Sequence, residues 1–249
     1  MIKYLYHIAI AILLFCINLC QAQSETIAVQ HFDKAIISPH IQVTFIEGEK
    51  ESVMIENARL PQEKINIEVA GNTLRMYLDG AKTTTKTVKT NENGWERKKP
   101  IYKGTMVTAV ITYTQLRELS IRGEEIIECK SPIKRDDFRL KIYGESKMTM
   151  NSLKVNSLRV SIYGESYLEI KEGSVNDQKY TVYGEGKVNT LGMINENTKI
   201  TAYGESNFRV RVSDHLKVTA YGEATVAYNG NPSIHKGIIL GEATIHKIN

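Results

Sequence analysis

Tyrosine and glutamate recur in this sequence on either side of a repeated glycine, at a spacing suited to binding chemistry. The tyrosines are Tyr143, Tyr163, Tyr183, Tyr203 and Tyr221, and the glutamates are Glu145, Glu165, Glu185, Glu205 and Glu223. If successive copies stack, the tyrosines form one outward line able to stack on sugar rings. The glutamates then form a second line, whose carboxylates are suited to Ca²⁺. A structural alternative is that the tyrosines pair between copies while the glutamates only solvate the surface.

The same residues are unsuited to acid–base catalysis. A general acid and a general base are two carboxyl groups in different environments that face one pocket, whereas these glutamates repeat with identical neighbours. The sequence has no Gly-x-Ser-x-Gly nucleophile motif, no phosphate-binding glycine loop and no His-Glu-x-x-His zinc motif. Cys129 falls in a column of mostly core residues, which favours inert packing over a nucleophile. The sequence therefore predicts no catalytic residue and no required cofactor.

The elements that position these residues follow from one period. Seven glycines recur at intervals of 18 to 21 residues, namely Gly123, Gly144, Gly164, Gly184, Gly204, Gly222 and Gly241. Apolar residues occupy the positions two before and four after each glycine, which share parity and indicate strands with one buried face. The glycines indicate corners with positive φ or close chain approach, and the residue two beyond is small in all copies except Glu125. This pattern predicts an all-β, right-handed parallel β-helix of about 20 residues per coil.

The remainder of the chain predicts two further segments. Residues 116–249 hold the seven corners, whereas residues 23–115 alternate as strands without a period and predict an irregular β region that continues or caps the stack. Residues 23–249 are expected to form one continuous domain. Within them, residues 82–103 carry seven Lys and Arg against two Glu and predict a basic hairpin insertion. Its candidate contacts to an anionic glycan, a lipid head group or an acidic partner are Trp95, Lys98 and Lys99.

The first residues predict export. Residues 1–22 combine Lys3, an apolar run over residues 8–17 and a short polar end, which is typical of a signal peptide, and the run is too short to span a bilayer. Cleavage after Ala22 leaves Cys129 as the single cysteine, so no internal disulfide is expected. The net charge of +4 falls to +3 without Lys3, which favours neither nucleic acid nor a membrane as partner. The expected location is the periplasm, the outer cell surface or the medium.

Several stretches together resemble a known family. They are "VQHFDKAIISPHIQVTFIEG", "INIEVAGNTLRMYLDG", "VTAVITYTQLRELSIRGEE", the repeated glycine corners and "YNGNPSIHKGIILGEATI". The chain resembles the head GIN domain family, which is named for proposed auto-transporter adhesins of exported bacterial proteins. The resemblance covers nearly all of the chain after residue 22 and implies a right-handed β-helix and adhesion. This sequence differs by placing Tyr and Glu around the glycine, where small or hydroxylated residues are usual, and by its basic insertion.

These observations predict a non-enzymatic, exported, adhesin-like scaffold that binds a glycan or an envelope protein. Two alternatives stay open at this point. Parallel β-helices also host polysaccharide lyases and hydrolases, so a carbohydrate-active enzyme is one alternative, although the repeats show no isolated cluster of Asp, Lys or Arg. A calcium-stabilised structural module is the other. Both ends of a β-helix expose unpaired strand edges, so self-association is a further expectation.

Overall fold

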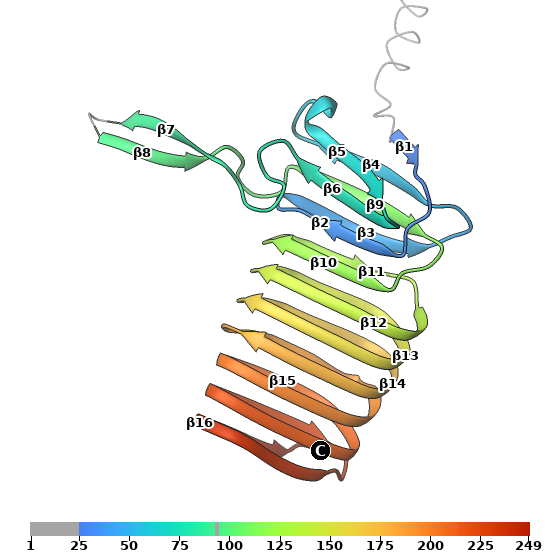
Figure 1. Cartoon of the computed structure of the whole chain (residues 1–249), viewed down its shortest axis with the longest axis vertical. Helices are drawn as coiled ribbons and strands as arrows, with labels where there is room; N and C mark the ends of the chain where they lie inside the picture. The colour runs from blue at the N-terminus through green and yellow to red at the C-terminus, as the bar shows by residue number, and fades with distance from the viewer. Residues whose placement is uncertain (1–24, 93–94) are drawn as a thin grey trace, which may run out of the picture.

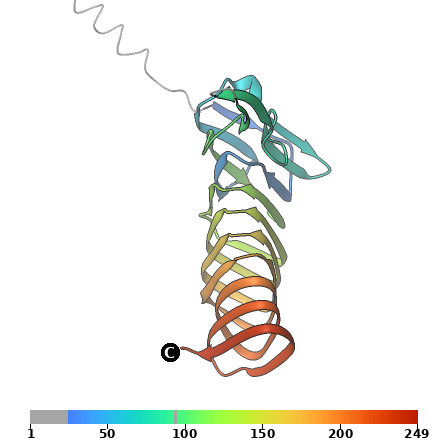
Figure 2. The same cartoon turned by 90° about the vertical axis from the view of Figure 1, so that its left-hand side faces the viewer.

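The computed structural model describes residues 25–92 and 95–249, so the predicted signal peptide, residues 1–22, lies outside the described residues. Within these ranges the chain forms sixteen strands and one short 3₁₀ helix, with no α-helix. Fourteen strands belong to one continuous sheet that winds on itself, and the other two form a separate hairpin. Figure 1 shows the coils stacked along one axis, and Figure 2 shows them winding around it.

The elements are β1 (Glu25–Ala28), β2 (Lys34–Ile37), β3 (Ile41–Glu47), β4 (Ser52–Ala58), η1 (Gln62–Lys64), β5 (Ile65–Ala70), β6 (Thr73–Leu78), β7 (Thr87–Glu92), β8 (Trp95–Pro100), β9 (Val107–Tyr113), β10 (Glu118–Gly123), β11 (Ile126–Cys129), β12 (Ile133–Gly144), β13 (Lys147–Gly164), β14 (Tyr167–Tyr183), β15 (Lys187–Asn229) and β16 (Ser233–Lys247). The longest strands contain bends, so each runs around more than one side of the stack.

The second half of the chain is the predicted parallel β-helix. β10 pairs in parallel with β12, β12 with β13, β13 with β14, β14 with β15, and β15 with β16. The corner glycines are in register, with Gly123 beside Gly144 and Gly144 beside Gly164. In β13 the pairing with the next coil is interrupted near Asn151 and Asn156. The ladder between β13 and β14 is therefore divided into three runs. The prediction of an all-β solenoid is confirmed.

The interior of the stack is filled by the columns that the period identified. The residues two before, four after and six after each of the first five corners are buried, including Cys129. Exposure of these columns begins at Tyr228, after the sixth corner, and extends over the last coil. Burial raises the pKa of the Cys129 thiol, because the thiolate would lose its hydration. Cys129 is thus a packing residue and not an activated nucleophile.

The corner itself shows why glycine and a small residue recur. Gly164 has a φ of 123°, and a Cβ placed on it would lie 2.3 Å from the carbonyl oxygen of Gly144 in the preceding coil. Ser166, two residues later, is buried and its hydroxyl donates a hydrogen bond of 2.9 Å to the same Gly144 oxygen. Ser146 makes the equivalent bond to Gly123. Positive φ, close chain approach and an inward serine therefore define the corner.

The N-terminal region both continues the stack and caps it. β2 and β3 pair in parallel with β10 and β11, and β6 and β9 then pair in parallel with β2 and β3. These two extra coils are closed by antiparallel strands, since β5 pairs with β6, β4 with β9, and β1 with β4. In Figure 1 these strands cover the end of the molecule opposite β16. The cap satisfies the ladder edge that a parallel stack would otherwise expose.

The basic segment forms the expected hairpin. β7 and β8 pair with each other in an antiparallel two-stranded sheet, and Figure 1 shows this sheet projecting away from the coils. The paired strands are shorter than the predicted segment 82–103, because residues on both sides of them form a stem that is bonded to the body. In this stem the Tyr102 hydroxyl donates to the carbonyl of Asp79, and Ile101 N donates to the carbonyl of Lys86.

Candidate ligand-binding face

One outer face of the stack is lined by the five repeated tyrosines, which we call the tyrosine ladder: Tyr143, Tyr163, Tyr183, Tyr203 and Tyr221. Successive ring centroids lie 4.6 to 4.9 Å apart, and their planes differ by 2° to 5°. The guanidinium of Arg122 lies 4.5 Å from the centroid of Tyr143 and extends the row by one coil. Each stacked pair is expected to contribute about 0.5–1.5 kcal/mol beyond the area that it buries. The ladder is therefore a rigid part of the coil surface.

The stacking determines which part of each ring a ligand can reach. Tyr163, Tyr183 and Tyr203 remain 37–41% exposed, but each has another tyrosine against both faces. We expected sugar rings to stack on the faces of these tyrosines, but both faces of these three rings are already covered by neighbouring tyrosines. The prediction of face-on stacking is therefore wrong for them. Ring edges and phenolic hydroxyls stay accessible. Within the described residues, none of the five hydroxyls has a hydrogen-bond partner.

The glutamate line runs beside the ladder. Glu145, Glu165, Glu185, Glu205 and Glu223 are all exposed, and Glu223 is in register with Glu242 in the last coil. Ca²⁺ takes six to eight oxygen ligands. The described part of the chain contains no group of three or more His, Cys, Asp or Glu side chains placed to hold a metal ion. The calcium hypothesis thus gains no support from the geometry of this line.

Two further columns on the same strands escaped the sequence analysis. Three residues before the corner, Ser161, Thr181 and Thr201 are in register, and five residues before it, Arg159, Lys179 and Lys199 are in register. They share the outward parity of the tyrosines, since all lie an even number of residues from them. The same twenty-residue period carries this signal, at positions farther from the glycine than the tyrosine and glutamate columns. The face therefore displays phenols, aliphatic hydroxyls and cations in parallel rows.

The base of the hairpin stem lies next to Tyr143, at the N-terminal end of the tyrosine ladder. A hollow of about 400 Å³ is lined by His40, Thr85, Arg122, Glu125 and Tyr143, among others. His40 Nε2 lies 2.6 Å from the Thr85 hydroxyl, and His40 Nδ1 lies 2.8 Å from the Gly104 carbonyl. The His40 ring also contacts Tyr102 edge-on, with centroids 5.7 Å apart. These bonds fix the stem beside the first coil of the ladder.

Glu125 lies two residues after the first corner glycine, Gly123, at the position where the other corners carry a small residue. Its side chain is buried in this first corner. Its side chain is 5% exposed, accepts a hydrogen bond of 3.0 Å from Glu124 N and lies 3.9 Å from His40 Nδ1. Burial disfavours the carboxylate and raises the pKa of Glu125 above the ordinary value of 4.5, although the Glu124 amide and His40 act in the opposite direction.

The raised pKa of Glu125 predicts a pH dependence of stability. The Glu125 carboxyl binds its proton more tightly in the folded protein than in the unfolded chain, so protonation of Glu125 stabilises the fold. This stabilisation is present at acid pH and is lost as the pH rises from 4.5 through the folded pKa. The Glu125→Gln variant, which mimics the neutral acid, should gain melting temperature relative to the wild type across that window. Melting curves of both proteins at a series of pH values measure this difference. A difference that does not change with pH would contradict the expectation.

The hairpin residues do not join the ladder. Trp95 is 75% exposed, and Lys98 is exposed opposite Lys89 in the two-stranded sheet. Lys99 also belongs to β8, opposite Val88. Because the sheet projects from the coils, Trp95, Lys98 and Lys99 form a candidate surface separate from the ladder. The stem between the two is bonded to the body through His40 and Thr85.

Residues 31–232 match the family described as "Putative auto-transporter adhesin, head GIN domain". The chain belongs to the head GIN domain family. The expected resemblance is thereby confirmed, and the match includes the hairpin and most of the corners. No helix in the described part of the chain is long and apolar enough to cross a membrane.

Solved structures share the fold of this head GIN domain. A "putative adhesin" from Bacteroides fragilis has a TM-score of 0.74 at 17% identity, covering 90% of this chain and 96% of that one. A "putative adhesin" from Parabacteroides merdae has a TM-score of 0.63 at 18% identity, covering 91% and 96%. A "Putative lipid binding protein" from Parabacteroides distasonis has a TM-score of 0.64 at 16% identity, covering 91% and 96%. No curated protein sequence matches the chain.

Proposed function

We propose that this head GIN domain is a non-enzymatic, exported adhesin-like module that binds a glycan or an envelope protein along the face of the tyrosine ladder. The observation that carries the proposal is the ladder itself. Four coil-to-coil contacts hold five tyrosines in one row, and their hydroxyls have no hydrogen-bond partner within the described residues. A surface that is polar, aromatic and rigid before binding loses little conformational entropy when a ligand docks.

The arrangement favours binding over catalysis. A glycosidase needs two carboxyl groups with different environments on either side of one bond. The repeated glutamates are instead all exposed and stand in one row, and the one buried glutamate of the corners, Glu125, lies beside His40 under the hairpin stem. The family name supports adhesion and export, and the sequence of residues 1–22 supports export independently.

The proposal is tested by retention of the purified protein on a glycan array and on isolated envelope protein, beside an assay for breakdown of the same polysaccharides. We expect retention without turnover. The Tyr183→Ala/Tyr203→Ala variant should lose most of the retention, because it removes two adjacent hydroxyls and opens a gap in the ladder. The matched control is Tyr167→Ala, a partly exposed tyrosine that follows the corner on a different segment of the coil.

Two outcomes would overturn the proposal. Turnover of a polysaccharide without retention would favour the carbohydrate-active enzyme. Equal loss of retention in the ladder variant and in the Tyr167→Ala control would place binding elsewhere on the molecule. Circular dichroism melting curves of each variant separate loss of binding from loss of folding.

A further inference from the structure

The strands of the tyrosine ladder also carry a row of cations, which we call the basic column: Arg159, Lys179, Lys199 and Lys217. Arg159 is in register with Lys179, and Lys179 with Lys199. Lys217 lines the same groove as the other three, and all four side chains are exposed. Parallel strands lie about 4.8 Å apart, so the column presents one cation per coil at a regular spacing.

The positive charges of these four side chains are not balanced by acidic partners among the described residues. Within residues 25–92 and 95–249, none of them forms an ion pair. Nearer the N-terminal end, in contrast, Glu118 pairs with Arg139 at 3.7 Å and with Lys141 at 2.7 Å. Like charges held about 5 Å apart repel one another even in water. A ligand that carries negative charges in a row would relieve this repulsion.

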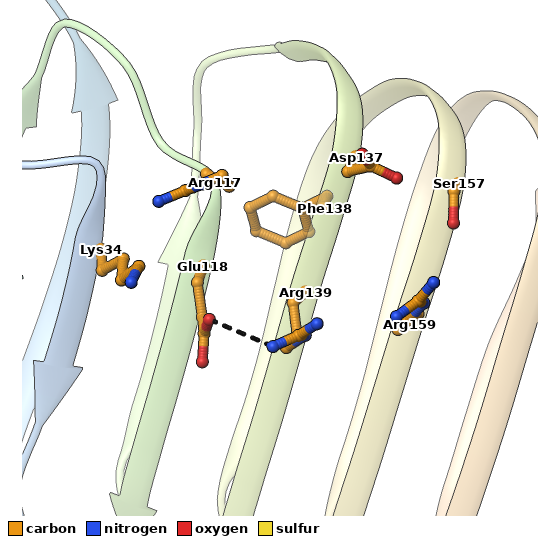
Figure 3. A pocket seen from close by; sticks show the side chains of 8 residues that line it. All are labelled: Lys34, Arg117, Glu118, Asp137, Phe138, Arg139, Ser157 and Arg159. Atoms are coloured by element: carbon orange, nitrogen blue, oxygen red, sulfur yellow. Dashed lines mark ion pairs between the residues drawn. The ribbon is translucent and has the colours of Figure 1, made fainter.

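The basic column lies along a shallow groove. One hollow of about 340 Å³ is lined by the four cations together with Asp177, Asn197 and His215. A second hollow, of about 250 Å³, shares Ser157 and Arg159 with the first and extends the groove to Arg139 and Lys34. Figure 3 shows the second hollow, in which Lys34, Glu118, Arg139 and Arg159 lie on successive strands and Glu118 forms an ion pair with Arg139. The groove thus runs across several coils.

The acidic groups of the groove do not cancel its charge. Asp177 accepts a hydrogen bond of 3.1 Å from Asn197 Nδ2, and Asn197 Oδ1 is in turn 2.9 Å from His215 Nδ1. This row of polar side chains forms one margin of the groove. The Ser161, Thr181 and Thr201 hydroxyls lie on the other side of the basic column, between it and the tyrosine ladder. Hydroxyl and amide groups on both margins suit a ligand that is polar as well as anionic.

We propose that the basic column is the binding site for a linear polyanionic glycan, a polysaccharide that carries carboxylate or sulfate groups at regular intervals along its length. The inference rests on the proposed function and names the class of ligand that the face takes. The glycan runs along the stack, with its anionic groups on Arg159, Lys179, Lys199 and Lys217. Its hydroxyls meet the Ser and Thr column and the phenols of the ladder.

The neighbouring columns favour a glycan over other polyanions. Single-stranded nucleic acids bind by stacking bases on aromatic faces, and the faces of Tyr163, Tyr183 and Tyr203 are covered by neighbouring rings. An anionic membrane is held best where apolar side chains next to the cations enter the lipid. The columns beside the basic column carry Ser, Thr, Asp and Asn instead.

The test compares binding of the purified protein to polygalacturonate and chondroitin sulfate with binding to neutral dextran, each at low and at physiological ionic strength. We expect the two polyanions to bind, the affinity to fall as salt increases, and dextran to bind at least about tenfold more weakly. The Lys179→Glu/Lys199→Glu variant should lower the affinity for the polyanions about tenfold or more, since two attractive contacts become repulsive.

The matched control is Lys147→Glu/Lys187→Glu, which changes the net charge equally on exposed lysines that follow the corner on another segment of the coil. Its affinity should stay within about twofold of the wild type at physiological salt. Equal losses in both variants would show a general charge effect and overturn the proposal. If Lys179→Glu/Lys199→Glu fails to fold by circular dichroism, the neutral Lys179→Gln/Lys199→Gln variant serves in its place.

The same binding test includes two other classes of polyanion, a nucleic acid and an anionic membrane. Binding of double-stranded DNA or of phosphatidylglycerol vesicles as tightly as the polysaccharides, with the same loss in the charge variant, would overturn the glycan assignment. Failure of both polyanions to bind would overturn the inference. If the ladder variant Tyr183→Ala/Tyr203→Ala then still lost retention of a neutral glycan or an envelope protein, the proposed function would stand without the basic column.

Discussion

Replacing Gly164 with alanine is expected to lower the free energy of unfolding by about 3 kcal/mol or more. Two costs combine at this position. The φ of 123° is strained for any residue with a side chain, and the added Cβ would lie 2.3 Å from the carbonyl oxygen of Gly144. Relief requires the two coils to separate, which would also disturb the Ser166 hydrogen bond to that oxygen. Urea unfolding followed by circular dichroism measures the loss.

Gly71→Ala is the matched control for this prediction. Gly71 also has a positive φ, 54°, but a Cβ built on it has no heavy atom within 4 Å. Its substitution should therefore cost only the left-handed conformation, about 1–2 kcal/mol. If the two substitutions destabilised the protein equally, the close approach of successive coils would not be what selects glycine at the corners.

Truncating Tyr180 to alanine is expected to cost about 3–5 kcal/mol, since the site would become a cavity inside the stack. Tyr180 is fully buried and packs near Phe208, with ring centroids 6.1 Å apart. Its hydroxyl donates a hydrogen bond of 2.8 Å to Gln178 Oε1 and lies 3.3 Å from the Thr190 hydroxyl. Gln178 Nε2 in turn donates to Thr198, which donates to Asn195. The burial raises the pKa of Tyr180, so the phenol stays neutral.

Tyr180→Phe separates packing from hydrogen bonding. The ring is kept, but Gln178 Oε1 loses its donor, and a buried unpaired group costs about 1–3 kcal/mol. Tyr163→Phe is the control, because the Tyr163 hydroxyl has no partner within the described residues and its loss should change stability by less than about 0.5 kcal/mol. Chemical denaturation of the three variants provides the comparison. A Tyr180→Phe variant as stable as the wild type would show that the buried network contributes nothing.

The repeating half of the fold could be predicted from the sequence, because equivalent positions in successive coils have the same surroundings. Ile142, Ile162 and Val182 all point inward at the same place in successive coils, so one column of apolar residues identifies a buried face. The corner glycine could be interpreted in the same way, since both positive φ and close approach exclude a side chain. Local periodicity therefore predicted the strands, their parallel pairing and the outward line of tyrosines.

The N-terminal coils could not be predicted, because their order along the axis differs from their order in the chain. β6 and β9 follow β2 and β3 in sequence, yet β10 stacks on β2 and leaves β6 and β9 outside. The segments between these strands include β4, β5 and the hairpin, which lengthen the coils and remove the period. The contact of His40 with Thr85 likewise joins residues that only this folding brings together.

The β-helix, its inward and outward columns and its glycine corners could all be predicted from the sequence, because each depends on residues at a fixed short spacing. Three properties emerge only in the folded chain: the tyrosine rings cover each other's faces, Glu125 is buried beside His40, and the basic column lies along a groove. These properties depend on side-chain orientation and on contacts between different coils. A one-dimensional pattern specifies which residues share a face, but not how closely their side chains approach or what they leave exposed.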